Sequence, residues 1–326
     1  MALDARSARL QAAREEELLR GRPYAVIRAM RSTVTELWSD KAGMFGVLVM
    51  LVMFAMAIFA PLIAPYPPDA QSLFDRLQGP SWDHPMGTDQ LGRDVLSRVI
   101  YGSRISLEVG LAVVALAGTF GVFMGLVAGY RGGRTSSFIM RWVDTQVAFP
   151  GLLLALIILS VVHPSLKAII IVLAINGWMV YARITRGIVL STRERPYVEA
   201  AELAGCKSRR VIFRHILPNL ASPLLTLAVL EFARMVIAEA ALSFLGLGTQ
   251  PPAVSWGLMI AEGRDYISSA WWVITFPGIA LSLTVLGANL FASWMRITAD
   301  PLQRERRGRS CRSRRAIPRQ AGWGAG

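Results

Sequence analysis

Six long stretches of apolar residues constrain this chain more than any other feature of its sequence. Stretches of about 18 residues or more are long enough, as helices, to cross the ~30 Å hydrocarbon layer of a bilayer. The chain has 326 residues, of which 53% are hydrophobic and 17% charged, whereas soluble domains have about 45–50% and about 25%. The sequence therefore predicts an all-α membrane protein with six transmembrane helices, which excludes soluble enzymes, fibrous chains and disulfide scaffolds. The stretches are 44–64, 107–130, 138–162, 168–190, 220–247 and 271–295.

The predicted spans divide the chain into three parts. Residues 1–43 form an N-terminal segment, residues 44–295 the six-span transmembrane domain, and residues 296–326 a basic tail. The first apolar stretch begins far from the N-terminus, so we interpret it as a retained span and not as a cleaved signal. One apolar face of the N-terminal segment favours an interfacial helix on the membrane over a soluble linker helix. That face consists of Ile27, Met30, Val34, Leu37 and Trp38.

The distribution of basic residues predicts the orientation in the membrane. Of the 35 Lys and Arg residues, 28 lie before the first span, in the second and fourth connections, or after the last span, and only 6 lie in the other connections. Basic residues are enriched on the cytoplasmic side of membrane proteins, so both termini are expected in the cytoplasm. The tail 303–319 carries eight arginines, which we interpret as contacts with anionic lipid and not with nucleic acid.

The sequence lacks the common motifs of catalysis and metal binding. It contains no GxxxxGK[ST] phosphate loop, no HExxH and no GxSxG, so we expect no catalytic role and no ATP hydrolysis by this chain. Its cysteines, Cys206 and Cys311, and its three histidines are scattered, and His84 beside Asp83 matches no compact ligand motif. We therefore expect no metal and no cofactor. An integral membrane enzyme or a self-gated channel is disfavoured, because the spans hold few titratable groups and no repeated pore segment.

The connection between the fourth and fifth spans carries the most informative pattern. Pro196 suits the first position of a helix, and Gly205 suits the left-handed residue after a helix ends. A second helix is predicted from Lys207 towards Pro218. One face of the first helix is nearly free of side chains, which would let the surface of another protein approach closely. This face consists of Ala200, Ala201, Ala204 and Gly205.

The same connection resembles a loop of a known transporter family. Glu199-Ala200-Ala201, then Gly205, then Leu217-Pro218 are similar to the EAA loop of permease subunits in bacterial ATP-binding-cassette importers. His215 departs from the pattern, which usually has isoleucine there. The resemblance implies that Glu199–Gly205 forms a coupling helix that docks on an ATPase subunit.

Further stretches resemble the dipeptide, oligopeptide and nickel branch of these importers, and within it the second type of permease subunit. They are 87–98 with 101–107, and 239–252 with 255–257, and the resemblance covers about 44–301. It implies the type I importer permease fold in the bacterial inner membrane. The implied partners are a homologous second permease, two ATP-binding subunits and an extracytoplasmic substrate-binding protein. Di- and oligopeptides are the expected substrates, with nickel and glutathione left open.

Four charged residues within the spans are candidates for the translocation pathway. Glu231 and Arg234 lie three residues apart in the fifth span, with Glu239 two turns after Glu231, and Asp144 lies at the cytoplasmic end of the third span before Pro150. A charge at the centre of a membrane helix costs about 2.5–3.5 kcal/mol, so such residues face protein or water. The sequence leaves open whether Glu231 and Arg234 form a structural pair or line a cavity. It likewise leaves Asp144 as a pathway residue, a cap, or a partner of Arg141.

The second span carries a ridge of small residues at every fourth position, namely Ala117, Gly121, Gly125 and Gly129. Such a ridge lets membrane helices pack backbone to backbone. We expect it to pack against another helix, either of this chain or of a second permease.

Overall fold

The computed structural model describes residues 38, 40–163 and 165–299. The described residues form helices and connecting loops, and no β-strand occurs among them. The predicted interfacial face in the N-terminal segment lies outside this part except for Trp38, and the basic tail beyond residue 299 lies outside it as well.

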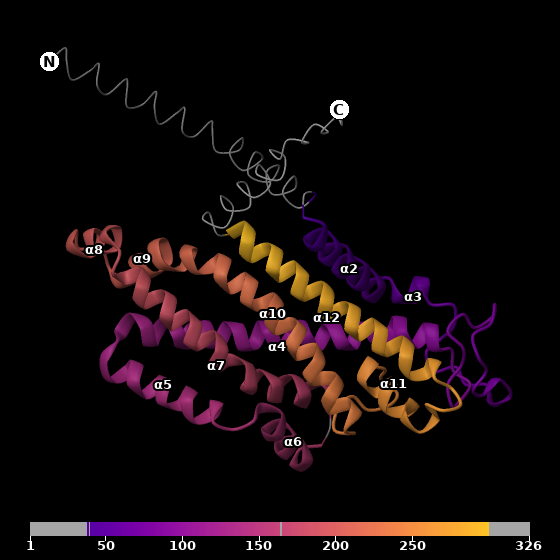
Figure 1. Cartoon of the computed structure of the whole chain (residues 1–326). Helices are drawn as coiled ribbons and strands as arrows, with labels where there is room; N and C mark the ends of the chain where they lie inside the picture. The colour runs from indigo at the N-terminus through magenta and orange to yellow at the C-terminus, as the bar shows by residue number, and fades with distance from the viewer. Residues whose placement is uncertain (1–37, 39, 164, 300–326) are drawn as a thin grey trace, which may run out of the picture.

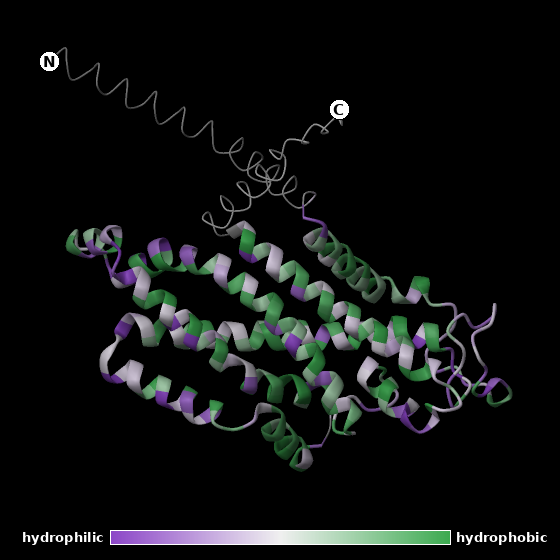
Figure 2. Ribbon diagram, viewed as in Figure 1, coloured by the Kyte–Doolittle hydropathy of each residue, from purple (hydrophilic) through white to green (hydrophobic). Residues whose placement is uncertain are grey.

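Among the described residues, five helices are long and apolar enough to span a membrane: α2 (Lys41–Ile58), α4 (Val95–Arg131), α7 (Leu166–Arg193), α10 (Leu217–Phe244) and α12 (Trp272–Ala299). The predicted third span is a bent pair, α5 (Gly133–Val147) and α6 (Gly151–Val161), whose axes differ by 82°. The bend lies at Ala148–Pro150, because proline disfavours helical backbone at the residue before it. The six predicted spans are therefore five helices and one broken helix (Figure 2).

Short helices connect these elements. They are α3 (Ala60–Ile63), η1 (Leu73–Asp75), α8 (Pro196–Leu203), α9 (Ser208–Val211), the π-helical turn η2 (Ile212–Ile216), α11 (Trp256–Gly263) and η3 (Arg264–Tyr266). α8 and α9 lie at one end of the bundle, and α11 lies at the opposite end with the loop between α3 and α4 (Figure 1). The predicted second helix of the fourth connection exists as α9 and η2, which continue directly into α10.

α4 begins at Val95, well before the predicted start of the second span at residue 107. Its first turns contain Arg98 and Arg104, so a search for apolar runs does not reach them. The side chain of Asp94 accepts a hydrogen bond from the Ser97 N–H and caps this helix.

The small-residue ridge of α4 packs against α7 of the same chain. A Cβ atom added at Gly125 would lie 2.6 Å from the carbonyl oxygen of Ala182, and one at Gly129 would lie 2.7 Å from the Cβ of Val189. The two backbones are therefore in direct contact, which confirms the packing role and identifies the neighbouring helix. α2 packs on α12 in the same way, since a Cβ at Gly46 would lie 2.8 Å from the carbonyl oxygen of Gly287.

Candidate functional site: an exposed short helix and a charged cavity

The short helix α8 has the boundaries that its sequence predicts. Pro196 occupies its first turn, and Gly205 has a φ of +76°, which confirms the left-handed residue after the helix. The Gly205 N–H donates to the Glu202 carbonyl oxygen (3.0 Å) and the Cys206 N–H to that of Ala201 (3.1 Å). These two bonds form a Schellman motif, so the end of α8 is fixed by backbone geometry.

α8 rests on a small apolar core. Val198 is fully buried and packs with Val189, Val211, Ile216 and Leu220, which come from α7, α9, η2 and α10. Val198 therefore belongs to one buried apolar cluster with residues of two membrane-spanning helices, α7 and α10.

The outward surface of α8 is open. Glu199, Ala200, Ala204 and Gly205 are exposed, Ala201 is half-buried, and Leu203 is 84% exposed. A Cβ atom at Gly205 would meet no atom of the described residues within 4 Å. Leu217 and Pro218 begin α10 directly after the π-helical turn η2, and the Leu217 N–H donates to the Ile212 carbonyl oxygen of that turn.

At the opposite end, a closed ring of four charged side chains joins the loop before α4 to α11. Asp89 contacts Arg93 Nε (2.7 Å) and Arg98 Nη1, and Glu262 contacts Arg93 Nη2 (3.1 Å) and Arg98 Nη2 (2.9 Å). Asp89 and Arg98 are almost fully buried. We call these four residues the outer ionic ring. Two carboxylates and two guanidiniums neutralise one another within this chain.

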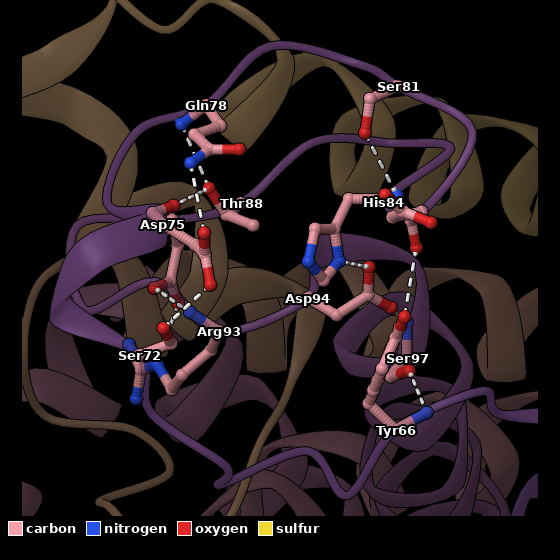
Figure 3. Close-up of polar contacts among 12 residues, drawn as sticks. Tyr66, Ser72, Asp75, Gln78, Ser81, His84, Thr88, Arg93, Asp94 and Ser97 are labelled. Atoms are coloured by element: carbon pink, nitrogen blue, oxygen red, sulfur yellow. Dashed lines mark hydrogen bonds and ion pairs between the residues drawn. The ribbon is translucent and has the colours of Figure 1, made fainter.

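Hydrogen bonds organise the loop beside the outer ionic ring (Figure 3). His84 Nδ1 lies 3.0 Å from Asp94 Oδ1, and the Gln78 N–H donates to Thr88 Oγ1 (2.9 Å). The Trp272 Nε1–H donates to the Thr88 carbonyl oxygen (3.0 Å), which attaches the loop to α12. Among the described residues, no group of three or more His, Cys, Asp or Glu side chains is placed to hold a metal ion.

Glu231 and Arg234 form an ion pair on α10. Arg234 Nη2 lies 2.7 Å from Glu231 Oε2, as the spacing of three residues allows. The two partners differ in burial, because the Glu231 side chain is 8% exposed and that of Arg234 is 51% exposed. One charged side chain in a membrane span is thus left half-covered by this chain.

Asp144 forms an ion pair with Arg183 of α7, with Arg183 Nη2 2.7 Å from Asp144 Oδ1. Arg141, the partner considered from the sequence, does not make this contact. Gln146 holds the two helices together nearby, because its Oε1 accepts a hydrogen bond from Trp178 Nε1–H (3.0 Å). Both Asp144 and Arg183 are more than half exposed.

A cavity of about 560 Å³ is lined by Arg183, by Arg234 and by residues on both sides of the break between α5 and α6. Its walls are mainly apolar, and its polar groups include the two guanidiniums and the amide of Asn176. The lining residues are Val147, Phe149, Gly151, Leu152, Leu173, Asn176, Met179, Val180, Arg183, Ile184, Arg234, Met235 and Ala238.

A second cavity, of about 500 Å³, lies beside the first and towards the α8 end of the bundle. It shares Ile184 with the first cavity and is lined otherwise by residues of α10 and by Arg296. Its α10 residues run from Asn219 to Leu230, whereas those of the first cavity run from Arg234 to Ala238. The two cavities therefore follow one another along α10.

Glu239 lies outside both cavities. Its carboxylate is fully buried and accepts hydrogen bonds from the hydroxyl groups of Ser243 (2.7 Å), Thr249 (3.2 Å) and Ser106 (3.3 Å). Of the four charged pathway candidates, Arg234 is the one that lines either of these two cavities, and Glu231 and Asp144 are joined to the first cavity through their arginine partners. The sequence analysis missed Arg183 and Asn176, which lie on α7 and carried no signal beyond their polarity.

Comparison with known proteins identifies the family. Residues 121–304 match the model of the binding-protein-dependent transport system inner membrane component, and residues 30–80 match the N-terminal transmembrane domain of oligopeptide transport permease C. The di/tripeptide transport system permease protein DppC of Pseudomonas aeruginosa (strain UCBPP-PA14) is 41% identical over 83% of this chain and 92% of its own. The dipeptide transport system permease protein DppC of Alkalihalophilus pseudofirmus is 39% identical over 85% of this chain and 91% of its own.

A solved structure, described as an amino acid ABC transporter with histidines, aligns with a TM-score of 0.46 and 18% identity over 64% of this chain and 94% of that one. The larger family match covers more than half of the chain, and the relatives align over most of their own lengths. The chain therefore belongs to the inner membrane components of binding-protein-dependent transport systems, in the branch of oligopeptide transport permease C.

Proposed function

We propose that this permease imports di- or oligopeptides across the bacterial inner membrane as one subunit of a larger ATP-driven complex. Relatives named as dipeptide permeases, aligned over most of the chain, support the peptide substrate. The partners are a homologous second permease, two ATP-binding subunits that hydrolyse ATP, and an extracytoplasmic substrate-binding protein. Both termini and α8 lie in the cytoplasm, in accord with the 28 basic residues on that side.

The geometry of α8 is the observation that carries the coupling part of this proposal. Its exposed face of Glu199, Ala200, Ala204 and Gly205 leaves room for a partner, and Val198 attaches it to the apolar core of α7 and α10. A push on α8 by the ATP-binding subunits would therefore move whole spans and not only a loop. Such rigid-body motion is the usual basis of alternating access.

The charged residues of the spans complete the proposal. The path taken by the substrate is lined or adjoined by Arg234, Asp144 and Arg183, because half-exposed charges in a membrane helix face water or protein and not lipid. Glu231 adjoins the path through its ion pair with Arg234. Glu239 acts differently. Its hydroxyl contacts hold α4, α10 and the loop before α11 together, which makes it a structural element of the outer end.

Substitution of Ala200 by tryptophan tests the docking role. Ala200 is exposed and lies within regular helix, so Ala200→Trp blocks a close approach without straining the backbone, unlike a substitution at Gly205. We expect peptide-stimulated ATP hydrolysis and ATP-driven uptake of labelled dialanine by the reconstituted complex to fall at least tenfold, a barrier change of about 1.4 kcal/mol. The matched control is Leu51→Trp on α2, where the side chain is also exposed.

Two results would contradict the proposal. If the Ala200→Trp complex kept wild-type ATP hydrolysis and uptake, α8 would not be the surface on which the ATP-binding subunits dock. ATP-driven uptake of labelled nickel without uptake of dialanine by the wild-type complex would replace the peptide with a metal ion as substrate.

A further inference from the structure

We propose that the cavity between α6, α7 and α10 binds the carboxyl terminus of the peptide between Arg234 and the first turn of α6, while Asn176 accepts a hydrogen bond from a peptide N–H. The inference rests on the proposed peptide import and adds to it the group that the permease itself recognises. Three independent features of the cavity support it.

The first feature is the guanidinium of Arg234. It lines the cavity and uses Nη2 on Glu231, while half of the side chain stays exposed. A guanidinium has five N–H donors in a planar fork, so one carboxylate partner leaves donors for another. A carboxylate is the group that this fork binds best.

The second feature is the start of α6. Gly151 and Leu152, the first two residues of this helix of 11 residues, line the cavity. The first hydrogen bond of α6 is donated by the Leu154 N–H to the Pro150 carbonyl oxygen (3.0 Å), so the earlier N–H groups have no partner within the helix. Among the described residues, no side chain caps this end. Free N–H groups and the helix dipole both favour an anion there, as in the broken helices of other membrane transporters.

The third feature is the amide of Asn176. Its side chain is buried and lines the cavity, its Nδ2 donates to the Val172 carbonyl oxygen (3.1 Å), and its Oδ1 has no hydrogen-bond partner in the part of the chain that the structure describes. A Cβ atom added at Gly151 would lie 3.6 Å from this Oδ1, so the unpaired acceptor faces the start of α6. A buried acceptor without a partner is costly, and a ligand that donates an N–H would satisfy it.

The remaining walls suit the rest of a short peptide. Leu173, Met179 and Met235 are apolar, and methionine side chains adapt to ligands of different shapes. The volume of about 560 Å³ lies within the range of about 300–1,000 Å³ that is typical of small-ligand sites.

Transport of two peptides by the reconstituted complex tests the inference. Dialanine carries a carboxylate, and dialanine amide carries a neutral carboxamide in its place. The substrate-binding protein contributes the same preference in every variant, so a change in the ratio of the two uptake rates belongs to this chain. The variants are Arg234→Lys, the double variant Glu231→Gln with Arg234→Gln, which leaves no buried carboxylate unpaired, and Arg264→Gln as an exposed arginine outside the cavity.

In the double variant, we expect the ratio of dialanine uptake to dialanine amide uptake to fall about tenfold or more relative to the wild type. A change of this size corresponds to the loss of one hydrogen bond between charged groups. Arg234→Lys should keep most of the preference, and Arg264→Gln should keep all of it. A double variant with the wild-type preference would overturn the inference. Failure of the wild-type complex to move either peptide would instead overturn the proposed function.

A protection measurement covers the case in which the double variant does not assemble. A single cysteine at Ala238, in a chain without Cys206 and Cys311, lines the cavity and keeps Arg234 intact. Dialanine should slow its reaction with a neutral maleimide, and dialanine amide should slow it much less. Equal protection by both peptides, or none by either, would contradict a carboxylate site.

Discussion

The outer ionic ring and the two ion pairs beside the cavity are built from the same residue types but differ in how completely this chain covers them. In the ring, Asp89 and Glu262 each contact both Arg93 and Arg98, and Asp89 and Arg98 are almost fully buried. Beside the cavity, each carboxylate contacts one arginine, and both arginines, Arg183 and Arg234, are about half exposed.

This difference in burial suggests different roles for the two sets of charges: the outer ionic ring stabilises the fold, and the ion pairs beside the cavity respond to substrate. In the ring, two carboxylates and two guanidiniums neutralise one another inside the protein, and the ring fastens the loop before α4 to α11. Half-covered charges in a membrane span are stable only if water, a ligand or another subunit completes them. The cavity pairs are therefore the ones that we expect to respond to substrate.

Asp89→Asn should give the largest loss of stability. The variant leaves two guanidiniums, one of them fully buried, with a single carboxylate, and breaking a buried ion pair typically costs about 3–5 kcal/mol. The effect is measured by heating the detergent-solubilised chain and using size-exclusion chromatography to quantify the folded fraction at each temperature. Asp265→Asn, which removes an exposed carboxylate, is the control. An unchanged unfolding temperature for Asp89→Asn would contradict a structural role for the ring.

Arg234→Gln should have an intermediate effect. It leaves the buried carboxylate of Glu231 without its partner, a cost of about 1–3 kcal/mol, and adding Glu231→Gln should restore most of the loss. The yield and unfolding temperature of the assembled complex give the measurement. If the double variant is as unstable as Arg234→Gln alone, the pair does not act as a unit.

Asp144→Asn should change stability least. Both partners of this pair are more than half exposed, and exposed ion pairs contribute about 0–1 kcal/mol and are screened by salt. We expect unfolding temperatures close to the wild type at both low and high salt. A loss as large as that of Asp89→Asn would mean that Asp144 and Arg183 belong with the structural charges.

Local patterns in the sequence predict several of these features correctly. The spacing of Glu231 and Arg234 predicts a pair on one helix face, and glycine at position 205 predicts the left-handed residue that ends α8. The ridge from Ala117 to Gly129 predicts close packing of α4. Each of these depends on residues within one helix or one turn.

Contacts between distant helices could not be predicted in this way. Asp144 pairs with Arg183, 39 residues away, and not with the nearby Arg141, because the fold of α5 against α7 decides the partner. Glu262 meets Arg98 only when α11 packs on α4. The early start of α4 was missed because Arg98 and Arg104 interrupt the apolar residues of its first turns, so a search for long apolar stretches stops before them.

The central claim, that peptides pass beside the half-covered charges, is tested most directly by photocrosslinking. A dipeptide that carries a photoreactive benzoyl-phenylalanine is bound to the assembled complex, irradiated, and its adducts on this chain are located by mass spectrometry. The account predicts adducts on cavity residues of α6, α7 or α10, such as Leu152, Met179 or Met235, and competition by dialanine. The account would be contradicted if the same dipeptide were transported efficiently but its adducts were confined to the second permease or to the loop between α3 and α4 of this chain.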